Sequence, residues 1–248
     1  RTVPFVAKAT DSAIASIAAR LMAGEPLSNF PERAPYQEGA DISQPQPIAD
    51  QMTLADPLMP WFSVKEAVMP FNRFPGVDTI LGPEMRSTGE VMGWDRDFAT
   101  AFLKAQMGAG MKLPSEGKVF ISIKDADKTP LMLEAANLMV GMGFGIVATT
   151  GTATWLADQG VACERVNKVY EGRPNIVDLL KNDEIKLVMN TTEGAQAVED
   201  SRDIRAVALN DRIPYFTTAA GSHSAALAIQ AQLTGDLEVR SLQGLTAA

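Results

Sequence analysis

The chain has 248 residues, of which 46% are hydrophobic and 21% are charged, and its formal net charge is −8. This composition is typical of a globular protein with one or two domains and excludes a chain that is disordered throughout. The negative charge disfavours a broad nucleic-acid-binding face, which needs clustered Lys and Arg side chains. No apolar run is long enough for a membrane span, so we expect neither nucleic acid nor membrane as a partner.

Two rare residue types narrow the function classes further. Cys163 is the one cysteine, which excludes an internal disulfide. His223 is the one histidine, which excludes most metal clusters and most Ser-His-Asp arrangements. We therefore expect no metal site in this chain, a structural role for Cys163 and a place on the final helix for His223. The lack of disulfides suits a cytoplasmic protein. The start at Arg1, without an initiator Met or a signal-peptide core, suggests a piece of a longer chain.

The first part of the chain predicts few regular elements. From Ile14 to Met22 apolar side chains recur at i, i+3, i+4, i+7 and i+8, which predicts a helix over 11–24 with one buried face. The other expected elements are a proline-rich surface excursion over 26–60, a strand over 61–68 and a helix over 96–107. Because these elements contain no βαβ repeat, we expect residues 1–112 to complete a larger fold.

From residue 113 onward strands and helices alternate regularly. We expect strands over 119–123, 144–148, 163–167, 185–189 and 215–218, and helices over 131–142, from 152, and over 176–181, 195–209 and 222–233. This alternation predicts an α/β domain over 113–248, with a parallel sheet covered by helices on both faces and joined by right-handed crossovers. Such sheets bind ligands beyond the carboxyl ends of their strands.

Small polar and cationic side chains follow the predicted strands. The apolar run 146–148 leads into Thr149-Thr150-Gly151-Thr152, where a helix N-terminus would favour an anion. Alone, this stretch could equally be an ordinary capped turn, because Thr is a good N-cap. Similar groups after the other strands shift the balance to a phosphate site. The candidates are Ser122, Lys128, Thr149, Gly151, Thr152, Lys168, Asn190, Thr191 and Thr192. No Gly-x-Gly-x-x-Gly follows the first strand and no Walker motif is present, which disfavours a dinucleotide fold and a P-loop.

Long motifs run through both halves of the chain. They are RTVPFVAKAT at 1–10, PFNRFPGVD at 70–78, LGPEMRSTGEVMG at 81–93, VNKV at 166–169, EGRP at 171–174, NTT at 190–192 and EDSR at 199–202. On these motifs, residues 113 onward resemble the methylglyoxal-synthase-like domain. The whole chain resembles the C-terminal part of the carbamoyl-phosphate synthetase large subunit.

This resemblance implies that residues 1–112 finish the second ATP-grasp unit of a ligase, which makes carbamoyl phosphate from bicarbonate, glutamine-derived ammonia and ATP for pyrimidine and arginine synthesis. Arg1 would be a phosphate-side catalytic residue. The residues that hold ATP and Mg or Mn would lie upstream, so the fragment alone should be inactive and require no cofactor. The implied partners are a glutaminase small subunit, the upstream ATP-grasp units of the same subunit and further copies in an oligomer.

The resemblance also implies that residues 113–248 form an allosteric domain for an effector nucleotide, UMP or IMP. The effector phosphate would be held by Ser122, Lys128, Thr149, Gly151, Thr152 and Lys168, and the nucleoside side by Asn190, Thr191, Thr192 and Asp200. Glu66, Met69, Tyr215 and Thr217 match a site for ornithine. The chain departs from the family in three places: one extra residue in the helix after Lys128, Tyr170 in place of a frequent His, and a longer proline-rich excursion.

Two other hypotheses remain open at this point. A stand-alone lyase like methylglyoxal synthase would use the same phosphate cradle with an added carboxylate base. That family carries Gly-Gly-Asp soon after its third strand, where this chain has VYEGRP at 169–174. A nucleotide-binding module without a catalytic partner is the third hypothesis, and the long ATP-grasp-like segment disfavours it.

Overall fold

The computed structural model describes residues 2–10, 13–26, 29–30, 61–68, 89–191, 201–235, 237–239 and 241. Arg1, Met69, Thr192, Asp200 and most of segment 26–60 lie outside the described residues. The chain divides into two compact units, Arg1–Ser63 with Glu238–Ala248 and Val64–Leu237. The second unit spans the domain boundary expected at 112/113, which stays a prediction.

The described part of the first unit contains two helices, α1 (Thr2–Ala9) and α2 (Ile14–Met22). Helix α2 confirms the predicted helix, whereas α1 was not anticipated. The apolar face of α2 is only partly covered, because Ile14, Ile17 and Leu21 are half-buried and Met22 is 90% exposed. The expected buried face is therefore only partly formed in the part of this unit that the structure describes.

The second unit is built around a five-stranded parallel sheet with the order β5-β4-β3-β6-β7. Its strands are β3 (Lys118–Ser122), β4 (Gly145–Thr149), β5 (Glu164–Val166), β6 (Ile185–Asn190) and β7 (Tyr215–Phe216). The first strand of this sheet, β3, lies in its centre. The chain then moves outward through β4 and β5 and returns to the other side of β3 for β6 and β7. The predicted parallel sheet is confirmed, and its order reverses between β3 and β6, where such folds bind ligands.

Helices cover both faces of this sheet. Successive strand residues alternate between the two faces, so that Phe120 packs in one core cluster and Ile121 in the other. The cluster around Ile121 includes side chains of α5 (Pro130–Gly141), α6 (Thr150–Asp158) and α10 (Ala219–Thr234). The cluster around Phe120 includes side chains of α7 (Ile176–Lys181) and α9 (Arg202–Asn210). The α/β fold with both faces covered is thus as expected.

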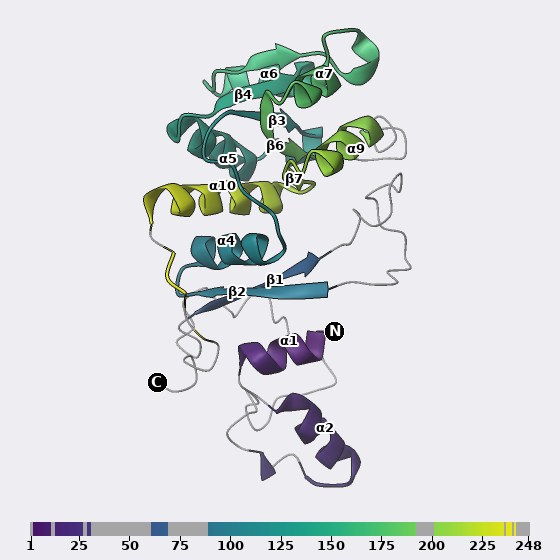
Figure 1. The fold of residues 1–248 in the computed structure, drawn as a ribbon, viewed down its shortest axis with the longest axis vertical. Helices are drawn as coiled ribbons and strands as arrows, with labels where there is room; N and C mark the ends of the chain where they lie inside the picture. Colours follow the sequence, from purple (N-terminus) through teal and green to yellow (C-terminus); the bar gives the residue numbers. More distant parts are fainter. Residues whose placement is uncertain are drawn as a thin grey trace. The chain divides into compact units, whose positions relative to one another are not determined.

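A further layer packs on α10. Strands β1 (Phe62–Val68) and β2 (Gly89–Asp95) form a two-stranded sheet, and α4 (Phe98–Gly108) packs on β2. Helix α10 contacts both α4 and α5 (Figure 1). The predictions of β1 and α4 are confirmed, and β2 was not predicted. At Gly93 of β2 an added Cβ would lie 1.9 Å from the carbonyl oxygen of Ala101, so strand and helix meet backbone to backbone.

Candidate functional site

The carboxyl ends of the central strands place three of the predicted residues next to one another. Ser122 ends β3 and Thr149 ends β4, and their hydroxyl oxygens lie 3.0 Å apart. Asn190 ends β6 and stands opposite Ser122 in the strand register. The parallel arrangement therefore gathers these side chains at one edge of the sheet, as the sequence pattern predicts.

Thr152 fastens the loop after β3 to the first turn of α6. Its hydroxyl oxygen accepts a hydrogen bond from the backbone N–H of Ile123 over 3.1 Å, and the residue is 2% exposed. The strand-to-helix turn is thus held by a buried bond between segments 29 residues apart in the chain. Thr152 fixes the geometry of the edge from within the fold.

The N-terminus of α6 carries no side-chain cap. Thr149 occupies the N-cap position with φ −69° and ψ 156°, but its side chain makes no capping bond and lies against Ser122 instead. The first-turn N–H groups of a helix have no intrahelical acceptors, and together with the helix dipole they attract an anion. The hydroxyl of Thr150 is buried here without a hydrogen-bond partner in the described part of the chain. This first turn can accept an anionic ligand.

A lysine ammonium lies close to this uncapped turn. Lys128 Nζ is 4.0 Å from the position that a Cβ of Gly151 would take, and 2.7 Å from Oδ1 of Asp125. The hydrogen bond and charge of Lys128 lower the pKa of the Asp125 carboxyl. Gly151 leaves room for the ammonium over the first turn, so a positive charge and the positive end of a helix dipole face the same space.

Lys168 follows β5, the strand that neighbours β4. Val166 of β5 pairs with Thr149 in the register, which places Lys168 at the same edge of the sheet. The residue is exposed, and its backbone N–H donates to a carboxylate oxygen of Glu171 over 2.8 Å. This bond sets the start of the short 3₁₀ turn Val169–Glu171. The exposed side chain can approach an anion bound at α6.

The end of β6 is tied into the fold on both sides. Asn190 is 3% exposed, and its Nδ2 donates to the hydroxyl of Tyr215 over 2.6 Å and to that of Ser201 over 3.2 Å. Thr191 donates its N–H to the carbonyl of Ser122, and its hydroxyl accepts from the N–H of Lys124. The side chain of Asn190 is therefore bonded within the protein, and Thr191 links β6 to the loop after β3.

The described residues expected to bind ornithine lie on separate elements, and two of them make bonds within the protein. Glu66 accepts a hydrogen bond from Nε2 of Gln106 over 2.8 Å, Tyr215 accepts one from Asn190, and Thr217 is exposed. Burial raises the pKa of the Glu66 carboxyl, although the bond from Gln106 partly offsets this effect. Glu66 is thus a carboxylate held in a half-buried position on β1.

Glu66→Gln should raise stability at neutral pH by a few tenths of a kcal/mol, because the ionised carboxyl is partly desolvated but still reaches water. A pKa that is raised on folding stabilises the protein at low pH, and this contribution is lost as pH rises through the folded-state value. Urea titrations of both proteins at about pH 4 and about pH 7 measure the difference. An equal effect of the substitution at both pH values would contradict the assignment.

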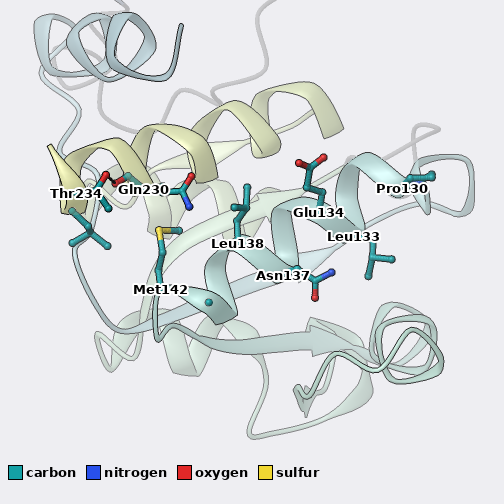
Figure 2. Close-up of a pocket in the computed structure, with 10 residues that line it drawn as sticks. Pro130, Leu133, Glu134, Asn137, Leu138, Met142, Gln230 and Thr234 are labelled. Atoms are coloured by element: carbon teal, nitrogen blue, oxygen red, sulfur yellow. Dashed lines mark hydrogen bonds between the residues drawn. The ribbon is translucent and has the colours of Figure 1, made fainter. Parts of the chain in front are cut away.

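The structure also contains a surface cavity that includes none of the predicted site residues. It has a volume of about 660 Å³ and lies between α5 and α10 (Figure 2). Its lining residues are Pro130, Leu133, Glu134, Asn137, Leu138, Gly141, Met142, Gln230, Leu233 and Thr234. Nearby, Nε2 of His223 in α10 lies 3.3 Å from Oε2 of Glu134 in α5, which confirms the place of His223 on the final helix.

Among the described residues, no group of three or more His, Cys, Asp or Glu side chains could hold a metal ion. No helix in that part of the chain is both long and apolar enough to cross a bilayer. Burial raises the pKa of the Cys163 thiol, which makes it a poor nucleophile and fits a structural role.

Comparison with known proteins identifies the relatives of this chain. A family model for the MGS-like domain matches residues 131–217. The carbamoyl phosphate synthase large chains of Mesorhizobium japonicum and Brucella suis are 50% and 52% identical to it over 98% of its length, and that of Pasteurella multocida is 50% identical over 99%. Nearly all of this chain is thus similar to the C-terminal region of carbamoyl phosphate synthase large chains. It covers 19% of the first two relatives and 21% of the third, about a fifth of their length.

The relationship to carbamoyl phosphate synthases confirms the resemblance inferred from the motifs. The MGS-like match includes β4, α6, β5 and β6, and therefore Thr149, Gly151, Thr152, Lys168 and Asn190. It lies within the five-stranded α/β part of the second unit. The identity to the synthase large chains extends beyond this domain to nearly the whole chain.

Sequence reasoning missed one part of the site, the pairing of Lys128 with Asp125. The two residues are three apart in the segment DADK, a spacing at which opposite charges meet on a helical turn. This signal was present in the sequence. The strand-end pattern predicts a ligand-binding role for Lys128 and predicts no partner for it.

Proposed function

We propose that this chain is the regulatory end of a carbamoyl phosphate synthase and that the N-terminus of α6 binds the phosphate of an effector nucleotide, UMP or IMP. The observation that carries this proposal is the uncapped first turn of α6 with the ammonium of Lys128 above it. This turn begins directly after β4, next to the point where the strand order reverses. A phosphate fits there because it can accept several N–H donors and neutralise the cation.

Each predicted residue has a part in this proposed site. The N–H groups around Gly151 and the ammonium groups of Lys128 and Lys168 would contact the phosphate oxygens, while Ser122, Thr149 and Thr152 hold the edge in shape. The nucleoside would extend toward the end of β6. Its proposed neighbours are Asn190, Thr191, Thr192 and Asp200. Effector binding at this site would change the affinity of the catalytic part of the enzyme for its own ligands. The coupling free energy between the two sites would be about 1–3 kcal/mol.

Titration of the chain with UMP and IMP by calorimetry tests the proposal. Lys168→Ala should weaken binding by about tenfold or less and leave the fold intact, because its side chain is exposed and one charge-assisted bond is worth about 1.5–3 kcal/mol before solvent screening. Lys112→Ala removes an exposed lysine before β3 and is the matched control. Equal affinities of the wild type and Lys168→Ala would count against the role of Lys168, and absence of binding to the wild type would overturn the proposal.

The proposal for the whole enzyme follows from its relatives. Their name, carbamoyl phosphate synthase large chain, supports a ligase that makes carbamoyl phosphate from bicarbonate, glutamine-derived ammonia and ATP. Residues 1–112 would complete its second ATP-grasp unit, with Arg1 on the phosphate side. The upstream ATP-grasp units would supply the ATP and metal sites, and a glutaminase small subunit would supply the ammonia. Glu66, Met69, Tyr215 and Thr217 remain the proposed ornithine contacts.

The fragment alone is expected to be inactive as a synthase. The metal-binding and most nucleotide-binding groups of the ATP-grasp unit would lie upstream of Arg1, so ATP and carbamate should give no phosphate release above a no-protein blank. A coupled phosphate assay measures this, with a complete synthase as the positive control. Phosphate release by the fragment that depends on both substrates would contradict the expectation.

The stand-alone lyase is not favoured by the relatives. The similarity to synthase large chains covers 98% of this chain, including the part before the MGS-like match. A lyase of the methylglyoxal synthase type would not need that first part. Conversion of dihydroxyacetone phosphate by the fragment would nevertheless revive the lyase hypothesis.

A further inference from the structure

We propose that Asp125 is a built-in competitor of the effector phosphate, whose carboxylate neutralises Lys128 while the site is free and must be displaced when a phosphate binds. This inference rests on the proposed function, because it concerns the same phosphate site. It assigns a role to a residue that does not itself hold the ligand. Asp125 would set the affinity of the site and favour doubly charged ligands over singly charged ones.

Lys128 and Asp125 differ strongly in the exposure of their side chains. The side chain of Lys128 is 20% exposed and that of Asp125 is 94% exposed, although Nζ and Oδ1 lie only 2.7 Å apart. Lys128 is therefore fixed beside the first turn of α6, and Asp125 reaches it from the solvent side. An exposed carboxylate can swing away at little cost, because water replaces its lost hydrogen bond. The part of the ion pair that can move is Asp125.

Electrostatics explains why this lysine needs an anion next to it. Its ammonium lies 4.0 Å from the point that a Cβ on Gly151 would occupy, in the first turn of α6, where the helix dipole is equivalent to about half a positive charge. The two positive charges repel each other, and the side chain of Thr149 does not cap the turn. Asp125 supplies one negative charge to this space.

A phosphate monoester satisfies both positive groups at once. It carries a charge of about −1.5 to −2 at neutral pH and has three acceptor oxygens, so it can contact the ammonium and the N–H groups of the α6 turn together. A singly charged ligand would only replace the charge that Asp125 already supplies. Replacement of the Asp125 carboxylate by the ligand therefore yields a net gain in binding free energy mainly for a dianion. In this way Asp125 favours dianionic over monoanionic ligands.

The segment that carries Asp125 joins the site to α5. Asp125–Asp127 forms a single 3₁₀ turn after β3, Lys128 follows it, and α5 begins at Pro130. The backbone of Lys128 donates to the carbonyl of Asp125, and that of Thr129 to the carbonyl of Asp127. The side chain that a phosphate would displace therefore belongs to the turn directly before α5.

Asp125→Asn tests the inference, because asparagine keeps the size of the side chain and removes its charge. We expect the variant to bind UMP and IMP about two- to fivefold more tightly than the wild type, the range expected for an exposed ion pair. The affinity for inorganic phosphate should rise as well. In a Lys128→Ala background the same substitution should change the affinity by a clearly smaller factor, since the two residues act as one pair.

Glu164→Gln is the matched control. It removes one negative charge and breaks another lysine pair, between Lys118 Nζ and Glu164 Oε2 at 2.8 Å, at the amino end of the sheet. This variant should bind the nucleotides as the wild type does. Thermal unfolding of each variant checks that the fold is retained.

The outcomes separate this inference from the proposed function. Tighter binding by Asp125→Asn but not by Glu164→Gln supports the competitor role. If the wild type binds UMP or IMP and Asp125→Asn binds equally or more weakly, the inference is overturned and the proposed function stands. If both variants bound the nucleotides more tightly by the same factor, the change in net charge alone would explain the result. That outcome would also overturn the inference. If neither the wild type nor Asp125→Asn binds nucleotide or phosphate, both proposals are wrong.

Discussion

Gly151→Asp is expected to abolish phosphate binding at α6 while leaving the protein at least as stable as the wild type. The new carboxylate would project from the second position of α6 toward Lys128, into the space that the phosphate needs. Like charges that meet in a partly desolvated site cost several kcal/mol, so nucleotide affinity should fall by about a hundredfold or more. An acidic residue in the first turn of a helix stabilises the helix by about 0.3–1 kcal/mol. Calorimetric titration with UMP and a thermal melt measure the two effects.

Gly151→Ala is the control for the shape of this position. A Cβ there meets nothing closer than the Lys128 ammonium at 4.0 Å, which is an ordinary contact. The affinity for UMP should therefore change little, and any small gain in stability should come from the helix propensity of alanine. If Gly151→Asp bound UMP as well as Gly151→Ala does, the phosphate would have to bind elsewhere.

Gly93→Ala should destabilise the second unit by about 1–3 kcal/mol or more. The added Cβ would lie 1.9 Å from the carbonyl oxygen of Ala101 and 2.3 Å from the backbone nitrogen of Ala105. Both contacts are with helix backbone, so no side chain can turn away to make room. Strand β2 and helix α4 would have to separate, which weakens the packing of α4 on α10. Urea unfolding measures the loss.

Gly141→Ala provides the comparison for this prediction. Gly141 is the last residue of α5, and a Cβ there meets nothing within 4 Å. This substitution should leave stability unchanged or raise it by up to about 1 kcal/mol, because glycine is a poor helix former. Equal stabilities of the two variants would show that β2 and α4 are not packed as the structure describes.

The α/β part of the fold was predictable because its signals are local. The apolar strands Lys118–Ser122 and Ile185–Asn190 are buried on both faces and read as continuous hydrophobic runs. Strand Gly89–Asp95 was missed because its sequence GEVMGWD contains two glycines and two carboxylates, which disfavour strands. Gly93 is required there by the close approach of α4, a tertiary cause that no local pattern reveals.

The edge of the sheet at which the candidate residues gather was predictable, and the direction of their side chains was predictable only in part. Strand ends placed Ser122 and Thr149 correctly at one edge, where their hydroxyls meet. The face on which Asn190 lies follows from the period of two, since Val188 packs in the α7–α9 cluster, whereas its bonds to Tyr215 and Ser201 depend on tertiary packing. The ion pair of Lys128 with Asp125 depends on the conformation of a short turn, and strand and helix periodicity do not determine it.

Helix α10 has a consequence for how a signal could pass through the second unit. One helix supplies packing surface both to α5, which begins beside the phosphate edge, and to α4, which rests on β2. A rigid helix with two neighbours cannot adjust to one of them without changing its fit to the other. If α5 shifted by a fraction of an ångström, the layer on the far side would have to follow or lose contact. The proposed phosphate site and the layer of β1, β2 and α4 would then be connected through side-chain packing, independently of the backbone link between them.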